Sequence, residues 1–271
     1  MTSTRDEKEA TEYLFDSGSD LGLEHLTYLE TLLDARSIAM LEPVGVQPGH
    51  RCLEIGAGTG SIARWLAARS GRTGKVLACD IDTTRLHGVP DVEVVRHDIN
   101  DGVPPGGPFD LIHARFVLTH LPRREQILAD LVDALAPGGW LVIGDPLGPP
   151  LEVISAPSPA DAELFQRVQH TSCYVVAPAS GIAFDWAPTL DDHFARSGLA
   201  NVHTERHTQT TTGGGAGCRL HANLNRQAEA PLLAAGLSKA ELDRYRALML
   251  DPRFRAWFHD LYYTRGQKQL A

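Results

Sequence analysis

The stretch that decides the fold is RCLEIGAGTGSIARWLA, from Arg51 to Ala67. Its three glycines, Gly56, Gly58 and Gly60, have a GxGxG spacing, follow a short apolar run and precede an amphipathic one. This order predicts a strand, a tight turn and a helix. A glycine-rich turn in that context is a candidate binding site for a nucleotide-like ligand.

Around this turn, short apolar runs alternate with amphipathic ones. We expect strands at 51–56, 74–80, 92–98, 109–115 and 140–146. Helices are expected at 25–41, 61–71, 83–88 and 123–139, the last ended by Pro-Gly-Gly. Such alternation is typical of an α/β fold in which a parallel sheet is buried on both faces.

The regular alternation stops after Pro146. The proline-rich stretch up to about Trp186 is predicted to be an insertion over the carboxyl edge of the sheet. Helices at 189–199, about 219–235 and 238–250 and strands at 201–211 and 255–266 follow, and Ser238 with Glu241 forms a predicted capping box. The predicted parts are a helical N-terminal arm or lid (1–45), a ligand-binding core (46–146), a cap insertion for the substrate (147–187), and a C-terminal part of the core with helical elaboration (188–271).

Composition narrows the class of partner. The 271 residues carry a formal net charge of -9 and no basic cluster, which argues against nucleic acid as a partner. The N-terminus lacks the apolar core of a signal peptide and no run is long enough to span a membrane, so we expect a soluble, cytoplasmic protein. The four cysteines show no CxxC spacing, and neither HxxxY nor DDH makes a convincing metal site. We therefore expect no metal.

Two ligands compete for the glycine turn. A dinucleotide would place its pyrophosphate at the helix N-terminus. The fingerprint of such sites is GxGxxG or GxGxxA, and Ser61 occupies its last position here. Glu54 would also bring negative charge close to the phosphates. S-adenosylmethionine (SAM) has no phosphate and carries positive charge, which suits Glu54. Asp80 ends the second strand and can accept both ribose hydroxyls. Asp98 ends the third strand and suits an adenine amino group.

Taken together, five motifs resemble the class I SAM-dependent methyltransferases. They are LEIGAGTG, LACDID, RHDIND, FDLIHARFVLTHLP and LAPGGWLVIGDP, and they span roughly Gly49 to Asp145. The chain also resembles, more loosely, bacterial methyltransferases that act on small molecules in specialised metabolism. The resemblance implies a Rossmann-like, mostly parallel seven-stranded sheet whose last strand, within 255–266, is antiparallel.

The resemblance also implies individual roles in binding SAM and releasing S-adenosylhomocysteine. Glu54 would act close to the ammonium group, Asp80 would hold the ribose and Asp98 the adenine amine. Tyr13 would cover the cofactor or serve only as surface packing. The other implied cofactor residues are Gly56, Ala57, Gly58 and Gly60 on the methionine side, Ile81 and Ile99 beside the adenine, and Ala114 and Arg115 at the end of the fourth strand.

Much of the catalysis of methyl transfer can come from holding the acceptor and the methyl group in line. A general base is needed only if the nucleophile holds a proton of high pKa. His120 is the candidate catalytic residue, as a general base or an orienting group, and the alternative is a structural histidine. His170 and Tyr174 lie one helical turn apart and therefore share a face. That face either lines an acceptor pocket or belongs to an ordinary half-buried helix. The candidate substrate residues are Phe116, His120, His170, Tyr174 and His221.

The insertion is rich in Pro, Ala, Val and Phe, which favours a small hydrophobic or aromatic acceptor and O- or C-methylation. The alternatives are a cyclisation or rearrangement on the same scaffold, a nicotinamide-dependent oxidoreductase, and a non-enzymatic binding module. A homodimer or higher oligomer is expected if the N-terminal arm packs on a partner chain.

Overall fold

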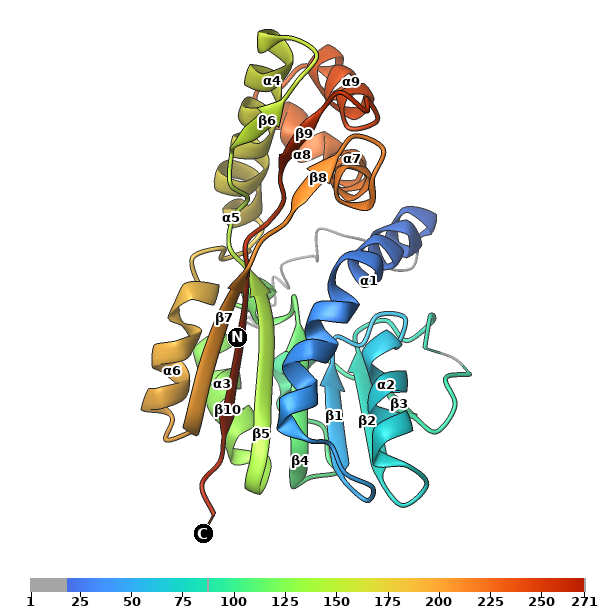
Figure 1. The fold of residues 1–271 in the computed structure, drawn as a ribbon, viewed down its shortest axis with the longest axis vertical. Helices are drawn as coiled ribbons and strands as arrows, with labels where there is room; N and C mark the ends of the chain where they lie inside the picture. Colours follow the sequence, from blue (N-terminus) through green and yellow to red (C-terminus); the bar gives the residue numbers. More distant parts are fainter. Residues whose placement is uncertain (1–18, 87, 271) are drawn as a thin grey trace, which may run out of the picture.

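The computed structural model describes residues 19–86 and 88–270. A seven-stranded sheet forms the lower part of the molecule in Figure 1, in the order β3-β2-β1-β4-β5-β10-β7. Neighbours from β3 to β5 are parallel, and β10 lies antiparallel between β5 and β7, which confirms the predicted fold class. The strands are β1 (Arg51–Ile55), β2 (Lys75–Asp80), β3 (Glu93–Arg96), β4 (Phe109–Arg115), β5 (Leu135–Pro146), β7 (Ala200–His207) and β10 (Leu261–Gln267).

Helices cover both faces of this sheet because side chains alternate along the strands. On β4, Leu111 packs with α1 and α2, whereas Ile112 packs with α3 and α6 on the other face. These helices are α1 (Asp20–Leu41), α2 (Ser61–Ser70), α3 (Arg124–Asp133) and α6 (Leu190–Arg196). Short 3-10 helices lie in the connections between these elements: η1 (Glu42–Val44), η2 (Ile99–Asp101), η3 (Leu118–His120) and η5 (Ala187–Thr189).

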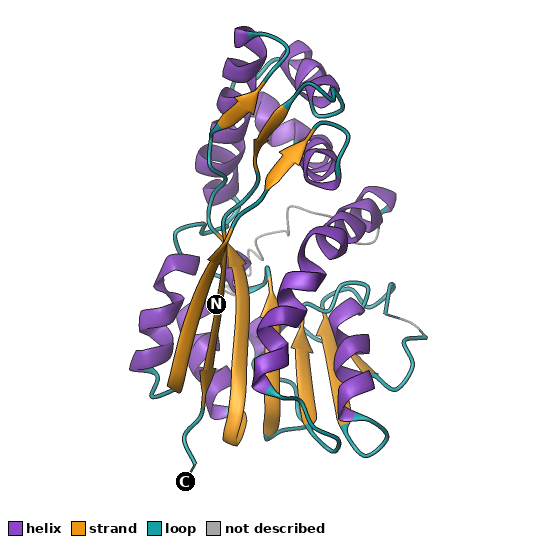
Figure 2. Cartoon of the chain, viewed as in Figure 1, coloured by secondary structure: helices purple, strands orange, loops and turns teal. Residues whose placement is uncertain are grey.

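A cap stands above the carboxyl ends of the parallel strands (Figure 2). Its antiparallel sheet has the order β6-β9-β8, and its helices enclose a separate apolar core that includes Phe165, Tyr245 and Phe254. The strands are β6 (Val153–Ser155), β8 (Thr210–Thr212) and β9 (Arg255–Trp257). The helices are α4 (Pro159–His170), the π-helix η4 (Thr171–Val176), α5 (Ala177–Ala179), α7 (Ala216–Gln227), α8 (Glu229–Ala234) and α9 (Lys239–Leu248), whose predicted capping box is present.

The cap is built from two stretches of chain, so the predicted insertion 147–187 supplies only β6, α4, η4 and α5. The remainder comes from the C-terminal segment that we assigned to the core. Two predicted strands are each divided for the same reason. Residues 201–211 fall into β7 and β8, and residues 255–266 into β9 and β10, because the chain crosses there between the core sheet and the cap.

Three predicted helices differ in detail. Residues 84–86 form a turn in place of the predicted helix, and Asp82 accepts a hydrogen bond from the Thr84 N–H. α3 ends at Asp133 because β5 begins at Leu135 and takes in the Pro-Gly-Gly segment. The predicted helix 219–235 is two helices, which fits Pro231, a residue without an N–H for a continuous helix.

Helix α1 joins the core to the cap. Its Asp34 forms an ion pair with Arg115 of β4 at 2.9 Å, and its first turn contacts α7, where Asn223 Nδ2 donates to the Leu21 carbonyl at 3.0 Å. In Figure 1 the helix runs from the core sheet up towards the cap. None of the helices in the described ranges is long and apolar enough to cross a membrane.

Candidate cofactor and acceptor site

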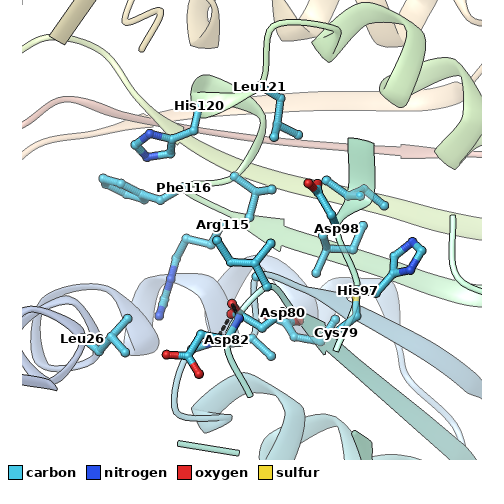
Figure 3. Close-up of a pocket in the computed structure, with 18 of the residues that line it drawn as sticks. Leu26, Cys79, Asp80, Asp82, His97, Asp98, Arg115, Phe116, His120 and Leu121 are labelled. Atoms are coloured by element: carbon cyan, nitrogen blue, oxygen red, sulfur yellow. Dashed lines mark hydrogen bonds between the residues drawn. The ribbon is translucent and has the colours of Figure 1, made fainter. Parts of the chain in front are cut away.

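A cavity of about 630 Å³ lies at the carboxyl ends of β1, β2 and β4. The strand order reverses between β1 and β4, which is where open α/β sheets bind ligands. In Figure 3, Phe116 and His120 lie together at one side of this cavity, and Asp98 and His97 lie at the other. The volume suits a nucleoside-sized ligand.

The glycine turn brings backbone to the cavity wall and leaves no room for side chains. Gly56 and Gly58 have φ angles of 65° and 57°. A Cβ on Gly56 would come within 2.4 Å of Val117, and one on Gly58 within 3.2 Å of Leu26. The predicted residues Gly56, Ala57 and Gly58 line the cavity, whereas Gly60 caps the start of α2 and does not.

Asp80 ties the end of β2 to the glycine turn. Its Oδ2 accepts from the Gly58 N–H at 2.9 Å and its Oδ1 from the Asp82 N–H at 3.1 Å. Burial raises the pKa of this carboxyl group, and the two N–H bonds oppose that shift. Each oxygen makes one of these bonds, so each keeps a lone pair for a ligand.

Asp98 and Ile81 occupy the outer part of the cavity. Asp98 Oδ1 accepts from the Asn100 N–H at 2.9 Å, and the carboxylate is exposed at the cavity edge. Ile81 is also exposed, as a large apolar side chain beside Asp80, and Ile99 is buried in the wall. An apolar surface next to acceptor oxygens is suited to a flat heterocycle with an amino group.

Glu54 lies at the base of the cavity in a buried pair. Its Oε2 is 2.8 Å from His113 Nδ1, directly across from it on β4, and both side chains are almost completely buried. Part of the carboxylate is therefore already engaged by the protein, which the sequence did not indicate. His113 Nε2 has no hydrogen-bond partner.

The remaining predicted cofactor residues fall into three groups. Arg115 lines the cavity, but its guanidinium donates to Asp34 and to Ser37 of α1 at 2.9 and 3.0 Å. Ala114 is buried in β4 and does not line the cavity. Tyr13 lies outside the described residues.

A second cavity, of about 110 Å³, lies between the core and the cap. It shares five wall residues with the first, and the π-helix η4 contributes Ser172, Cys173 and Val176. π-Helical turns are frequent at functional sites. The residues that line both cavities are His25, Leu29, Phe116, His120 and Ile182.

Phe116 and His120 form the junction between the cavities. Phe116 has a φ of 57°, an unfavourable conformation for a non-glycine residue that costs about 1–3 kcal/mol and is characteristic of functional sites. Burial lowers the pKa of His120 to about 4, with smaller contributions from the charges of His25 and Arg124. Burial likewise lowers the pKa of His25 to about 4. Both imidazoles are therefore neutral at pH 7.

The structure separates the other predicted substrate residues. His221 is buried and lines the second cavity. His170 and Tyr174 do share a face, with ring centroids 5.4 Å apart, but they are exposed and line neither cavity. Sequence reasoning missed His25, Gln169, Asn225, Tyr245 and His259, of which Asn225 could have been found as the residue one helical turn after His221.

Asp145, at the end of β5, is fully buried behind η3. Its Oδ2 accepts from the Thr119 N–H at 3.2 Å. Burial raises its pKa to about 7, although the Thr119 and Val117 N–H groups and the charge of Arg124 oppose the shift. Since η3 carries His120, this carboxyl group supports the junction between the cavities.

The raised pKa of Asp145 predicts a pH-dependent free energy of unfolding. The folded chain holds this proton more tightly than the unfolded chain, so the contribution declines as pH rises from about 4 to about 7. Asp145→Asn should remove that decline and stabilise the protein at pH 8 by up to about 4 kcal/mol. Urea unfolding of both proteins at pH 5 and pH 8 measures it. The buried histidines, whose pKa values are lowered, change the stability with pH in the opposite direction. Their effect is the same in both proteins and cancels when the two pH dependences are subtracted. Equal pH dependence in the two proteins would contradict the assignment.

A family model described as a methyltransferase domain matches residues 24–204, which is more than half of the chain. The chain belongs to the class I SAM-dependent methyltransferases. The chain is 36% identical over 107 residues to Methyltransferase str3 of Strobilurus tenacellus, an alignment that covers 39% of the chain and 38% of that relative. The chain thus aligns with well under half the length of this curated relative.

Solved structures show the same fold. Phosphoethanolamine N-methyltransferase 2 of Haemonchus contortus, in complex with S-adenosyl-L-methionine, matches with a TM-score of 0.56 at 15% identity, over 93% of this methyltransferase and 58% of that chain. The [4+2]-cyclase SpnF matches with a TM-score of 0.50 at 14% identity, over 88% and 81%. Family membership confirms the predicted family, fold and SAM cofactor.

Proposed function

We propose that this methyltransferase transfers a methyl group from SAM to a small, largely hydrophobic or aromatic acceptor held beneath the cap. The observation that carries the proposal is the common wall of the two cavities. The larger cavity has the acceptor oxygens and the glycine turn, and the smaller has mostly apolar walls. Phe116 and His120 belong to both, so ligands in the two cavities would meet there.

The residues of the larger cavity fit SAM. The turn at Gly56 and Gly58, which lines the cavity, would present bare backbone to the methionine portion. The free lone pairs of Asp80 would accept the ribose hydroxyls, and Asp98 the adenine amine, with Ile81 against the ring. Glu54 would contribute negative charge below the ammonium group through the pair that it forms with His113. When bound, the sulfonium supplies an electrophilic methyl group.

The chain's own contribution is positioning and exclusion of water. Leu29, Phe116 and Ile182 provide an apolar passage between the cavities, in which an acceptor is held in line. With a pKa of about 4, His120 is a weak base at pH 7. We therefore assign it the role of accepting a hydrogen bond from the acceptor and orienting it, rather than of removing a tightly held proton.

Calorimetric titration and product mass test this proposal. We expect SAM to bind with micromolar affinity and NADH to give no heat. Incubation with SAM and a panel of phenols, enols and amines should give a product 14 Da heavier, an increment that a methyl group in place of hydrogen imposes. A product of unchanged mass would instead indicate the cyclisation alternative. Binding of NADH without SAM would overturn the proposal.

In the same assay, His120→Phe separates positioning from cofactor binding. Loss of the hydrogen-bond acceptor should lower kcat/KM by roughly 10- to 100-fold and leave the Kd for SAM within about threefold. The matched control is His203→Phe, because His203 is exposed on β7 and lines neither cavity. An unchanged kcat/KM in His120→Phe would assign His120 a structural role.

A further inference from the structure

Among the residues that the structure describes, three buried polar atoms in the lining of the second cavity have no hydrogen-bond partner. They are His221 Nε2, Asn225 Nδ2 and His259 Nδ1, and their residues are 4%, 3% and 7% exposed. His221 and Asn225 lie one turn apart on α7, and the His221 and His259 rings have centroids 5.2 Å apart. Buried polar groups without partners are rare in folded proteins and call for an explanation.

Asn225 has a buried donor that no described residue engages. Its Oδ1 accepts from Arg246 Nε at 2.6 Å, and its backbone carbonyl accepts from the same guanidinium at 3.1 Å. Because an arginine can only donate, the carboxamide oxygen must face Arg246. The unpartnered Nδ2 therefore remains as a buried N–H donor.

His221 presents a second donor. Gln169 Nε2 lies 2.9 Å from His221 Nδ1 and 2.6 Å from the Tyr245 hydroxyl, while the Cys173 thiol donates to Gln169 Oε1. With the amide placed in this way, Nδ1 accepts and the ring proton is on Nε2. Burial lowers the pKa of His221 well below its ordinary value, so the ring is neutral with a single N–H.

His259 presents an acceptor. Burial lowers its pKa to about 4, against a backbone hydrogen bond with Leu147 that favours the protonated ring. The neutral ring has one N–H and one lone pair. The bond with the Leu147 carbonyl uses the N–H, and the unpartnered Nδ1 keeps the lone pair.

The cluster thus offers two donors, one acceptor and no charge. Arg246, the cation behind it, is already engaged by Asn225, Glu229 and Asp243. A buried carboxylate or phosphate would have no counter-charge here and would pay a large desolvation cost. A hydroxyl group, which accepts and donates at the same oxygen, matches all three atoms.

We propose that His221, Asn225 and His259 form a specificity subsite for a neutral hydroxyl group of the methyl acceptor. The oxygen accepts from His221 Nε2–H and Asn225 Nδ2–H, and the hydroxyl hydrogen is donated to His259 Nδ1. The inference rests on the proposed function and names its substrate class. The volume of about 110 Å³ is below the roughly 150 Å³ of an apolar cavity that binds benzene, so one ring anchored here would fill the cavity and extend beyond it. The expected acceptors are hydroxylated rings.

The anchored hydroxyl is distinct from the atom that is methylated. None of the three residues lines the cofactor cavity, whereas Phe116 and His120 line both. The subsite therefore holds one end of the acceptor while its other end reaches the junction. These residues are positioning residues, because they fix the orientation of the acceptor without touching the transferred group.

Phenol, toluene and benzoate are suitable probes, because they have nearly the same shape and differ in the polar group. Their Kd values would be measured by ligand-observed NMR titration of the full chain without SAM. Phenol should bind at least roughly tenfold more tightly than toluene, and benzoate more weakly than either. Equal affinities for phenol and toluene, as an apolar cavity or a trapped water would give, overturn the subsite. Tighter binding of benzoate or no binding of any probe also does so.

Two variants identify the donors. His221→Phe and Asn225→Leu keep the size of the side chain and remove one N–H each, so the preference for phenol should fall to less than about threefold. Leu224→Met, on the same helix and cavity, is the matched control and should keep the preference. Because these titrations contain no SAM, a chain that prefers phenol but binds no SAM would keep the subsite and lose the proposed function. A chain that binds SAM but does not prefer phenol would keep the proposed function and lose the subsite.

Discussion

Asp80→Ala should weaken SAM binding by about 100-fold or more. The carboxylate is placed to accept two ribose hydroxyls, and hydrogen bonds to a charged group contribute about 1.5–3 kcal/mol each. The substitution also removes the bonds from the Gly58 and Asp82 N–H groups, which hold the glycine turn against β2. Isothermal titration with SAM gives the Kd of each protein.

Two further variants define what this loss means. Asp80→Asn keeps one carbonyl oxygen and should fall between Asp80→Ala and the unchanged chain. Asp192→Ala, at an exposed position on α6, is the matched control and should bind SAM with unchanged affinity. Asp80→Ala with a Kd within threefold of the original would show that the ribose is held elsewhere.

His113→Leu should lower the free energy of unfolding by about 3–5 kcal/mol. The side chain of Glu54 is 5% exposed, and His113 is its only hydrogen-bond partner among the described residues. Removing one member of a buried pair leaves a desolvated carboxylate without compensation. Urea unfolding at pH 7.5 measures the change, with the slope of the transition checked for two-state behaviour.

The pair can be tested as a unit. The double variant Glu54→Leu, His113→Leu should recover most of the stability, because two apolar side chains of similar volume replace two desolvated polar ones. It should still bind SAM more weakly, since the negative charge at the base of the cavity is gone. The exposed control His203→Leu should stay within about 0.5 kcal/mol. A double variant less stable than His113→Leu would contradict the assignment.

Local sequence patterns placed several residues that line the larger cavity. Gly56, Gly58 and Asp80 are within 25 residues of one another, and their positions follow from one strand-turn-helix-strand unit. In a parallel sheet the strand ends must meet at one edge, so Asp98 could be assigned to the same cavity. The backbone conformation of this unit depends on residues that are close together in the sequence, so local patterns are enough to predict it.

The lining of the second cavity could not be predicted in this way. The i, i+4 spacing of His170 and Tyr174 correctly placed them on one face, but which face borders a cavity depends on how α4 and η4 pack against α7 and α9. Gln169, the preceding residue, faces inward instead. The partners of His221 come from residues 169, 245 and 259, so only the folded cap brings them together.

The position of the last two strands has a consequence for biosynthesis. β9 (Arg255–Trp257) is the middle strand of the cap sheet, and β10 (Leu261–Gln267) separates β5 from β7 in the core sheet. Neither sheet can be completed until these residues have left the ribosome, although β1 to β5 can pair as soon as they emerge. The ribosome-bound chain would thus expose the unpaired edges of β5, β6, β7 and β8 until residues 255–267 have emerged. A premature stop anywhere before Arg255 would release a chain in which both sheets lack a middle strand.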